Sequence, residues 1–142
     1  MLMESCVFCK IVKRQIPSST VCSDEKTLAF MDIQPVNDGH VLVIPKTHAE
    51  RLSGLDADTA CQMFKAALKL SDALRKSGLK CEGINLFLAD GEVAGQEVPH
   101  VHLHIIPRFE GDSFKMSFGH HYGRHPDREE LEATAEKIRK QL

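Results

Sequence analysis

The sequence predicts an α+β fold, with a mainly antiparallel five-stranded sheet, one long helix and a C-terminal helix. Short strand-like runs lie on both sides of one helical segment, and the turns between neighbouring runs are short enough for hairpins. The last part of the chain also has helical periodicity. Because 142 residues suit one domain, we expect a single domain over residues 1–142.

Four runs rich in β-branched and aromatic residues predict strands at 27–33 (TLAFMDI), 40–44 (HVLVI), 84–89 (INLFLA) and 101–106 (VHLHII). A weaker run near 21–23 predicts a fifth strand. Turn-forming residues separate the runs, as QP at 34–35, NDG at 37–39 and DG at 90–91. Strands joined by such short connections pair antiparallel.

The long helix is expected between the runs at 40–44 and 84–89. Asp56 or Asp58 can cap its start, and Lys76 lies in its last turn, before Gly78. Its apolar positions recur with helical period and are expected to face the core: Ala60, Met63, Phe64, Ala67, Leu68 and Leu74. A second helix around 127–141 has a similar stripe, also expected to pack on the core: Leu131, Ala135 and Ile138.

Composition excludes some classes of partner. A formal net charge of −2 argues against a surface for duplex nucleic acid or an anionic membrane, and no 18-residue apolar stretch occurs. Five cysteines, an odd number, without a signal peptide indicate reduced thiols, so we expect a soluble, cytoplasmic protein. Three of the cysteines have no partner spacing and are expected to be buried and inert: Cys22, Cys61 and Cys81.

The run HVHLH at 100–104 puts three histidines at alternate positions. Alternate side chains of a strand share one face about 6.6 Å apart, so His100, His102 and His104 are expected to point the same way. Val101 and Leu103 would then point into the core. Imidazole titrates near pH ~6.5 and offers two nitrogens, so three histidines in register indicate function.

Two kinds of chemistry are open for these histidines. A three-histidine zinc site is one, although the outer two imidazoles would have to converge over about 13 Å of backbone. Nucleophilic catalysis is the other, with one imidazole attacking phosphorus and a second serving as acid or base. In the preceding segment DGEVAGQEVP, Gly91 and Gly95 could let backbone N–H groups approach a phosphate, but an ordinary hairpin turn explains them equally well.

The segment AGQEVPHVHLHII resembles the His-φ-His-φ-His-φ-φ motif of the histidine triad (HIT) superfamily of nucleotide hydrolases and transferases, where φ is apolar. The likeness extends to DIQPVNDGHVLVIPKTH at 32–48 and to CVFCKIVKRQIPSS at 6–19. It covers most of residues 6–108, whereas 109–142 form a C-terminal extension without a family motif. The nearest resemblance is to bacterial and archaeal members with an N-terminal CxxC, and it implies a HIT-like fold.

The resemblance implies roles for particular residues. His102 would be the nucleophile that attacks the α-phosphate and carries a nucleotidyl group. His104 and His40 would surround the phosphate and the bridging oxygen, and would supply hydrogen bonds and proton transfer. Asp32 would accept hydrogen bonds from the ribose hydroxyls.

The family's remaining contacts also map onto this chain. The phosphate-binding segment corresponds to Gly95, Gln96, Glu97 and Val98. The apolar slot around the base corresponds to Phe8, Ile11, Phe30 and Ile33. The implied ligand is a purine nucleotide with an AMP moiety, and the implied assembly is a homodimer. An asparagine or glutamine of better-known members falls on or near Ala89 here, and this departure puts turnover or leaving-group preference in doubt.

The pair Cys6 and Cys9 is by itself only a moderate metal signal, because no second ligand pair follows it at zinc-finger spacing. A thioredoxin-like role is weaker still, since no βαβ pattern surrounds it. The family resemblance implies a structural zinc site that the two cysteines share with His48 and His100. No catalytic metal is expected.

These observations predict a nucleotide hydrolase or transferase that cleaves the α-phosphate linkage of nucleoside phosphoramidates or dinucleoside polyphosphates through a covalent nucleotidyl-histidine. Two alternatives stay open: a nucleotide-binding regulatory protein with little turnover, which Ala89 motivates, and a hydrolase with catalytic zinc on the triad.

Overall fold

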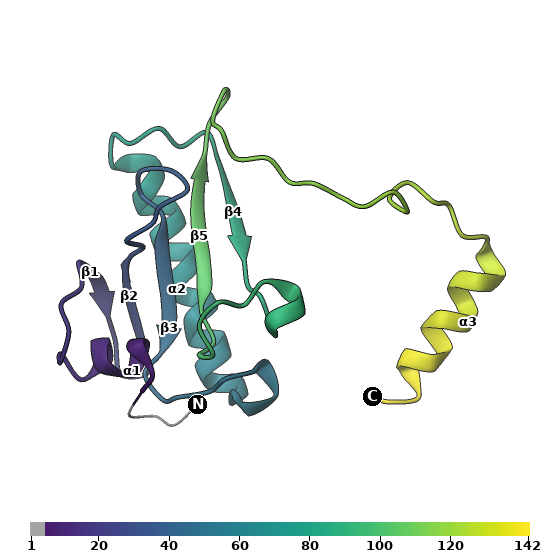
Figure 1. The fold of residues 1–142 in the computed structure, drawn as a ribbon, viewed down its shortest axis with the longest axis horizontal. Coiled ribbons are helices and arrows are strands. Elements are labelled where there is room, and N and C mark those ends of the chain that lie inside the picture. Colours follow the sequence, from purple (N-terminus) through teal and green to yellow (C-terminus); the bar gives the residue numbers. More distant parts are fainter. Residues whose placement is uncertain (1–4) are drawn as a thin grey trace. The chain divides into compact units, whose positions relative to one another are not determined.

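The computed structural model describes residues 5–142. The chain divides into two compact units, one that ends at Asp112 and a second, Ser113–Leu142, and each is described by itself. All five strands belong to the first unit (Figure 1). Within residues 5–142, no helix is long and apolar enough to cross a membrane.

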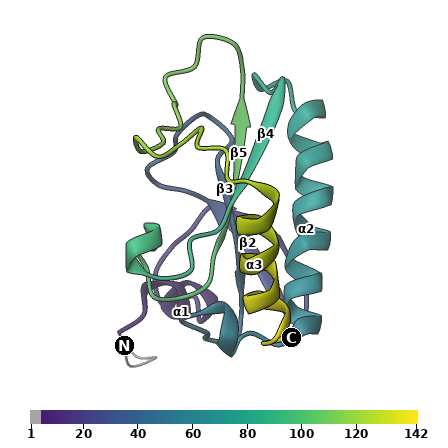
Figure 2. The same ribbon diagram turned by 90° about the vertical axis from the view of Figure 1, so that its right-hand side faces the viewer.

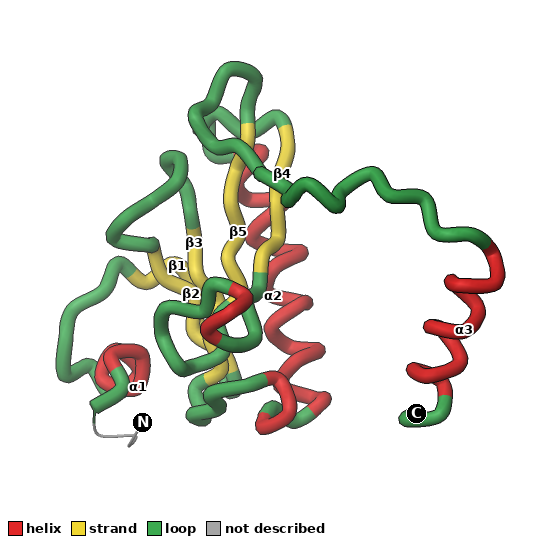
Figure 3. Tube along the Cα trace, turned by 45° about the vertical axis from the view of Figure 1, so that its right-hand side comes forward, coloured by secondary structure: helices red, strands yellow, loops and turns green. Residues whose placement is uncertain are grey.

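The five strands form one antiparallel sheet in the order β1-β2-β3-β5-β4, which confirms the predicted fold class (Figure 3). The central pair joins segments that are far apart in the chain, because β3 and β5 are neighbours with Leu42 opposite His104. The residue just before β3, His40, is therefore brought close to the triad. The strands are β1 Thr20–Ser23, β2 Thr27–Met31, β3 Val41–Pro45, β4 Gly83–Phe87 and β5 Leu103–Arg108.

One face of the sheet is covered by α2, Ala57–Lys76, which begins where the Asp56 side chain accepts a hydrogen bond from the Thr59 amide at 2.9 Å (Figure 2). The predicted stripe was partly wrong, because Phe64 and Leu68 are 55% and 60% exposed. At 100° per residue they lie to one side of the face that the sheet covers. That face consists of Met63, Ala66, Ala67, Leu70 and Leu74, together with Thr59.

The opposite face of the sheet carries α1, Val7–Val12, a helix that the sequence did not predict (Figure 2). Six residues are too few for a helical period to stand out, and Cys6 at its N-cap makes no side-chain cap. A second apolar cluster fixes α1 against the sheet; it consists of Cys6, Phe8, Cys9, Leu28, Phe30, Leu42 and Ile44. The chain therefore has a core on each side of the sheet.

In the second unit, α3 spans Arg128–Arg139 and begins with a full capping box between Asp127 and Glu130. Within this unit α3 buries none of its residues, so the unit by itself forms no core beneath the predicted apolar stripe. Two other sequence predictions fail, since Cys22 and Cys61 are exposed. Two 3₁₀ turns complete the first unit, Leu52–Gly54 and Glu92–Ala94.

Candidate functional site

The triad histidines lie on the α1 side of the sheet, but they do not all belong to one strand. β5 begins at Leu103, so only His104 is a strand residue; His100 lies in a bend and His102 in the irregular segment between that bend and the strand. This corrects the prediction of a strand over 101–106. The ring of Phe8 lies 5.7 Å from His100 and 5.2 Å from His102, edge-on to both. Neighbouring apolar residues point to the α2 core instead: Val101, Leu103 and Ile105.

His102 is buried, and its protonation pattern is fixed by the backbone. Its Nδ1 lies 2.7 Å from the carbonyl oxygen of His100. Because a carbonyl only accepts, Nδ1 carries the proton, and Nε2 of the neutral ring keeps its lone pair. An imidazole held in this way can act as a nucleophile through Nε2.

A second chain of hydrogen bonds fixes the tautomers of His40 and His104. The backbone N–H of Val36 donates to His40 Nδ1 at 3.1 Å, so the proton of the neutral ring is on Nε2. That N–H points at His104 Nδ1, 2.9 Å away, which leaves the proton of His104 on its own Nε2. His104 can therefore donate through Nε2 to a ligand.

Burial keeps both of these histidines uncharged. Burial, with smaller contributions from His102 and His40, lowers the pKa of His104 to about 4. The pKa of His40 is lowered by burial, against an opposing effect of Asp32. Near pH 7 the pair is neutral, as its hydrogen-bond pattern requires.

Asp32 completes a compact polar group with His40 and His104. Its Oδ2 lies 3.5 Å from His40 Nε2, and its Oδ1 accepts the Gln34 N–H at 2.8 Å. One ligand atom from each of the three lies within 4.8 Å of the others, a spacing that a metal ion could use. However, the Val36 N–H leaves His40 Nε2 protonated, so the nitrogen that a metal would need holds a proton instead.

Asp32, His102 and His104 line a cavity of about 340 Å³ whose other end is apolar, whereas His40 lies behind His104 and is not part of the lining. Most of the predicted nucleotide contacts meet there. Ile33 is 94% exposed, so it contributes to the rim. The predicted lining residues are Phe8, Ile11, Phe30, Asp32, Ile33, Glu97, Val98, His102 and His104. The sequence missed several others, which carry no chemical signal of their own: Val7, Ile16, Pro17, Ser18, Met31, Gln34 and Leu42.

Two residues of the predicted phosphate-binding segment, Gly95 and Gln96, are absent from the cavity lining. Gln96 is buried, and its side chain holds the loop together. Its Oε1 accepts the Gly91 N–H at 2.7 Å, and its Nε2 donates to the carbonyls of Glu50 (2.8 Å) and Val98 (3.1 Å). Gly95 ends the 3₁₀ turn with φ of 90°, a conformation that favours glycine.

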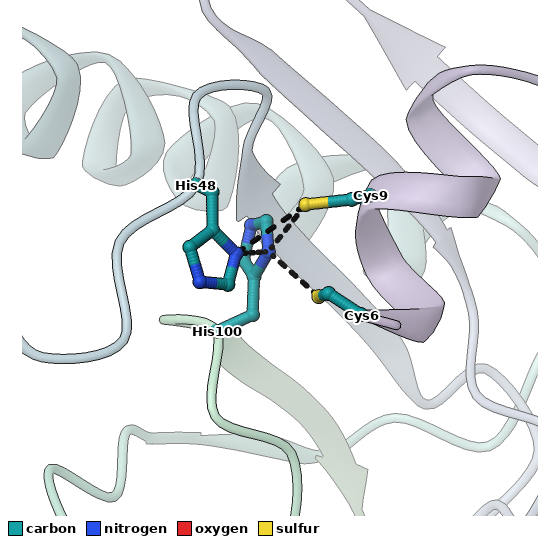
Figure 4. A group of neighbouring side chains, drawn as sticks. All are labelled: Cys6, Cys9, His48 and His100. Carbon is teal, nitrogen blue, oxygen red and sulfur yellow. Dashed lines mark hydrogen bonds between the residues drawn. The ribbon is translucent and has the colours of Figure 1, made fainter. Parts of the chain in front are cut away.

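The first triad histidine belongs to a separate group, shown in Figure 4. His100 meets Cys6, Cys9 and His48, the four residues of the predicted zinc site. The two histidine Nδ1 atoms are 3.2 Å apart. The Cys6 Sγ lies 3.4 Å from His100 Nδ1, and the Cys9 Sγ lies 3.3 Å from His48 Nδ1 and 3.7 Å from His100 Nδ1.

The donor set fits tetrahedral zinc. Zinc–nitrogen and zinc–sulfur bonds of about 2.05 and 2.3 Å place two nitrogens about 3.3 Å apart, and a nitrogen and a sulfur about 3.6 Å apart. His100 has the tautomer of a ligand, because its Nε2 donates to the Pro45 carbonyl at 2.8 Å and leaves Nδ1 free. Burial, with the Cys6 thiol next, raises the pKa of Cys9 to about 11, so the thiolate form needs a cation beside it.

The fold and the site together define a small α+β domain with a histidine-lined cavity on one face of an antiparallel sheet and a Cys₂His₂ group beside it. The chain belongs to the HIT domain family, whose model matches residues 13–111.

Among relatives, a HIT-like protein of Methanocaldococcus jannaschii is 48% identical over 114 residues, which cover 80% of this chain and 87% of that one. Adenosine 5'-monophosphoramidase HNT1 of Candida albicans is 39% identical over 107 residues, which cover 73% and 70%.

Solved structures agree with the fold. A HIT family member from Bacillus subtilis has a TM-score of 0.88 at 42% identity and covers 97% of each chain. A zinc-bound histidine triad family protein from Mycobacterium smegmatis has a TM-score of 0.76 at 37% identity, and covers 99% of this chain and 100% of that one.

Proposed function

We propose that this protein hydrolyses the α-phosphate linkage of adenosine phosphoramidates or dinucleoside polyphosphates through a nucleotidyl intermediate on His102. The observation that carries the proposal is the bond from His102 Nδ1 to the His100 carbonyl, which leaves Nε2 with a lone pair on a residue that lines the cavity. Relatives named adenosine 5'-monophosphoramidase support nucleotide hydrolysis at the level of the family.

In the first step, His102 Nε2 forms a bond to the α-phosphorus, and the bond to the leaving group breaks with its electron pair. The His40–His104 pair lends one proton to the leaving group through His104 Nε2. Burial keeps this pair neutral in the free protein, and the negative phosphate favours its protonated form once bound. Water then attacks phosphorus, the bond to His102 breaks, and the water's proton returns to the pair.

The cavity suits a purine nucleotide. Phe8, Ile11 and Phe30 offer an apolar slot for the base, and Leu42 adds to it. Asp32 would accept hydrogen bonds from the ribose hydroxyls. The backbone of residues 95–98 would approach the phosphate, with Gln96 holding the shape of that loop.

Rapid quenching with adenosine 5'-phosphoramidate, followed by mass spectrometry, tests the mechanism. We expect a transient adenylyl adduct on the peptide that contains His102 and none in His102→Ala. The absence of an adduct in the wild type under conditions of turnover, or an adduct that persists in His102→Ala, would contradict the proposal.

A second candidate function is nucleotide binding with little turnover. It is favoured by Ala89, a buried residue without the side-chain amide that better-known members carry there. AMP would then raise the melting temperature, while phosphoramidate, Ap₃A and Ap₄A would all stay intact.

We further propose that zinc at Cys6, Cys9, His48 and His100 is structural. All four positions of a tetrahedral ion would be filled by protein, so none is left for a substrate. The ion would join α1 to the segments after β3 and before β5. Its thiolate ligands require a reducing compartment, which agrees with a cytoplasmic location and with five free cysteines.

We also propose a homodimer that forms through β4. This strand lies at the edge of the sheet, and its Leu86 and Phe87 are 41% and 47% exposed. A second copy that paired with the open edge would satisfy its backbone groups and cover both side chains.

A further inference from the structure

We propose that the Glu97 carboxylate selects substrates whose leaving group is a cationic amine, and disfavours polyphosphate leaving groups. The inference rests on the proposed hydrolysis at His102 and names the substrate class of that site. It follows from the charges that line the cavity and from the fact that no side chain or backbone group among the described residues binds the Glu97 carboxylate.

Among residues 5–142, no positively charged side chain lines the cavity. Its lining includes two carboxylates, Asp32 and Glu97, and neither lysine nor arginine. Two histidines of the lining could offset negative charge only if they were protonated on both nitrogens. His102 uses Nδ1 to bind a carbonyl, and the pKa of His104 is lowered to about 4, mainly by burial, so His104 is neutral near pH 7. A site for a highly charged polyphosphate would be expected to offer basic side chains.

The two carboxylates differ in what they are free to do. Asp32 accepts the Gln34 N–H and lies 3.5 Å from His40 Nε2. Glu97 is exposed, and within residues 5–142 its carboxylate forms no hydrogen bond or ion pair. Its charge is therefore available to a ligand.

The backbone on both sides of Glu97 is held firmly. Gln96, immediately before it, is anchored by three side-chain hydrogen bonds. The carbonyl of Val98, immediately after it, accepts the His100 N–H at 2.8 Å. The backbone of Glu97 is thus held in the loop that leads into the triad, and Glu97 lines the same cavity as His102.

The charge of the leaving group then decides how well a substrate is accepted. A phosphoramidate has one negative charge at its phosphorus, whereas dinucleoside polyphosphates carry several, most of them on the leaving group. Like charges repel and an ammonium is attracted, and the effect strengthens where water is partly excluded. The leaving nitrogen takes the electron pair of its bond to phosphorus and one proton, and its distal charge is unchanged in the reaction.

The test uses three AMP derivatives with the same P–N bond and different distal charges, made from 1,3-diaminopropane (cationic), propylamine (neutral) and β-alanine (anionic). We expect kcat/KM to fall in that order, by about fivefold at each step, the size typical of a partly exposed charge pair. Ap₄A should rank below the neutral compound.

In Glu97→Gln the ratio of the cationic to the anionic substrate should fall towards one. The matched control is Glu92→Gln, which removes the same charge from the same loop at an exposed position outside the cavity lining. That variant should keep the wild-type ratio. An unchanged ratio in Glu97→Gln, or an equal fall in both variants, would overturn the proposal.

Dissociation constants separate this proposal from the proposed reaction. Calorimetry of the three compounds with the His102→Ala protein, which lacks the nucleophile, should give the same order of affinity. If the wild type hydrolyses none of them but the order of affinity holds and depends on Glu97, the reaction is wrong and the selection stands. Equal affinities for all three would refute the selection.

Discussion

At the scale of single residues, two histidines that are two positions apart have opposite proton arrangements. The backbone carbonyl of His100 requires a proton on His102 Nδ1. The ring Nε2–H of His40 requires a lone pair on His104 Nδ1. The same side chain is thus suited to attack at one position and to proton donation at the next. Alternation along a strand would make the two equivalent, so the difference comes from their partners.

The lowered pKa of His104 predicts a loss of stability in acid. The group titrates near 4 in the folded protein and near 6.5 when unfolded, so the unfolded chain binds more protons between these values. Stability from this residue is complete above pH ~6.5 and is lost as the pH falls towards 4. Urea denaturation measures the free energy of unfolding at pH 7.5 and at pH 5. Between these two pH values, this free energy should decrease by about 1–2 kcal/mol more in the zinc-loaded wild type than in His104→Gln. An equal loss in both would contradict the assignment.

At the scale of elements, the turn before β3 is tied to the end of β5. Asn37 Nδ2 donates to the Pro107 carbonyl at 2.9 Å and to Asp112 Oδ2 at 3.0 Å. Asp112 in turn binds Arg108 through two hydrogen bonds of 2.6 and 2.9 Å. The Asn37 carbonyl also accepts the His40 N–H. This clamp holds the turn whose Val36 N–H sets the tautomer of His40.

Asn37→Ala should therefore lower kcat by about tenfold, because it loosens the pair of histidines that transfers the proton. Acid–base catalysis typically contributes 10²–10⁴-fold to the rate, so a tenfold decrease corresponds to a partial loss of this contribution. KM should change little. ¹⁵N spectra should show His40 and His104 losing their single tautomers. Asn85→Ala is the matched control, because it removes an amide that accepts from Arg108 at 2.6 Å without touching the turn. Equal kcat losses in the two variants would reduce the role of Asn37 to general stability.

The proposed zinc site lies at the start of the short helix α1 and would hold that helix in place. Cys6→Ser should abolish stoichiometric zinc and lower the melting temperature, because burial of a two-cysteine, two-histidine group without its ion leaves unpaired polar atoms. Cys22→Ser, an exposed cysteine outside the group, should change neither. Zinc retained in Cys6→Ser, measured by atomic emission, would show that the site is assigned to the wrong residues.

At the scale of the whole molecule, the two edges of the sheet differ in what they expose. The β4 edge presents Phe87, whose ring lies 5.7 Å from His104, so a partner chain there would lie beside the triad. The β1 edge is formed by a strand with a register irregularity between Thr20 and Cys22, which makes continuous pairing less favourable.

Phe87→Asp should convert the protein to a monomer in sedimentation experiments. The new carboxylate would be buried where the β4 strands of two copies pair, with no positive charge to offset it, and this would destabilise the dimer. Val21→Asp places the same charge on the half-exposed β1 edge and should leave the dimer intact. A dimer that survives Phe87→Asp, or a wild type that sediments as a monomer, would refute assembly through β4.

Much of the molecule was predictable from local pattern. All five strands and both longer helices lie where the sequence placed them, within a few residues. The errors have a common cause. Phe64 and Leu68 are apolar and periodic, but burial depends on what lies opposite, which no local pattern contains.

By itself, the sequence determined the strand and helix pattern, a cap for the long helix at Asp56 or Asp58, and the presence of a histidine run and a cysteine pair. These depend on residues only a few positions apart. The tertiary structure decided which partner each histidine meets, because these contacts span the chain: His40 meets His104 across 64 positions, and Cys6 meets His100 across 94. Imidazole has two nitrogens of similar chemistry, and only its neighbours in space determine which one holds the proton.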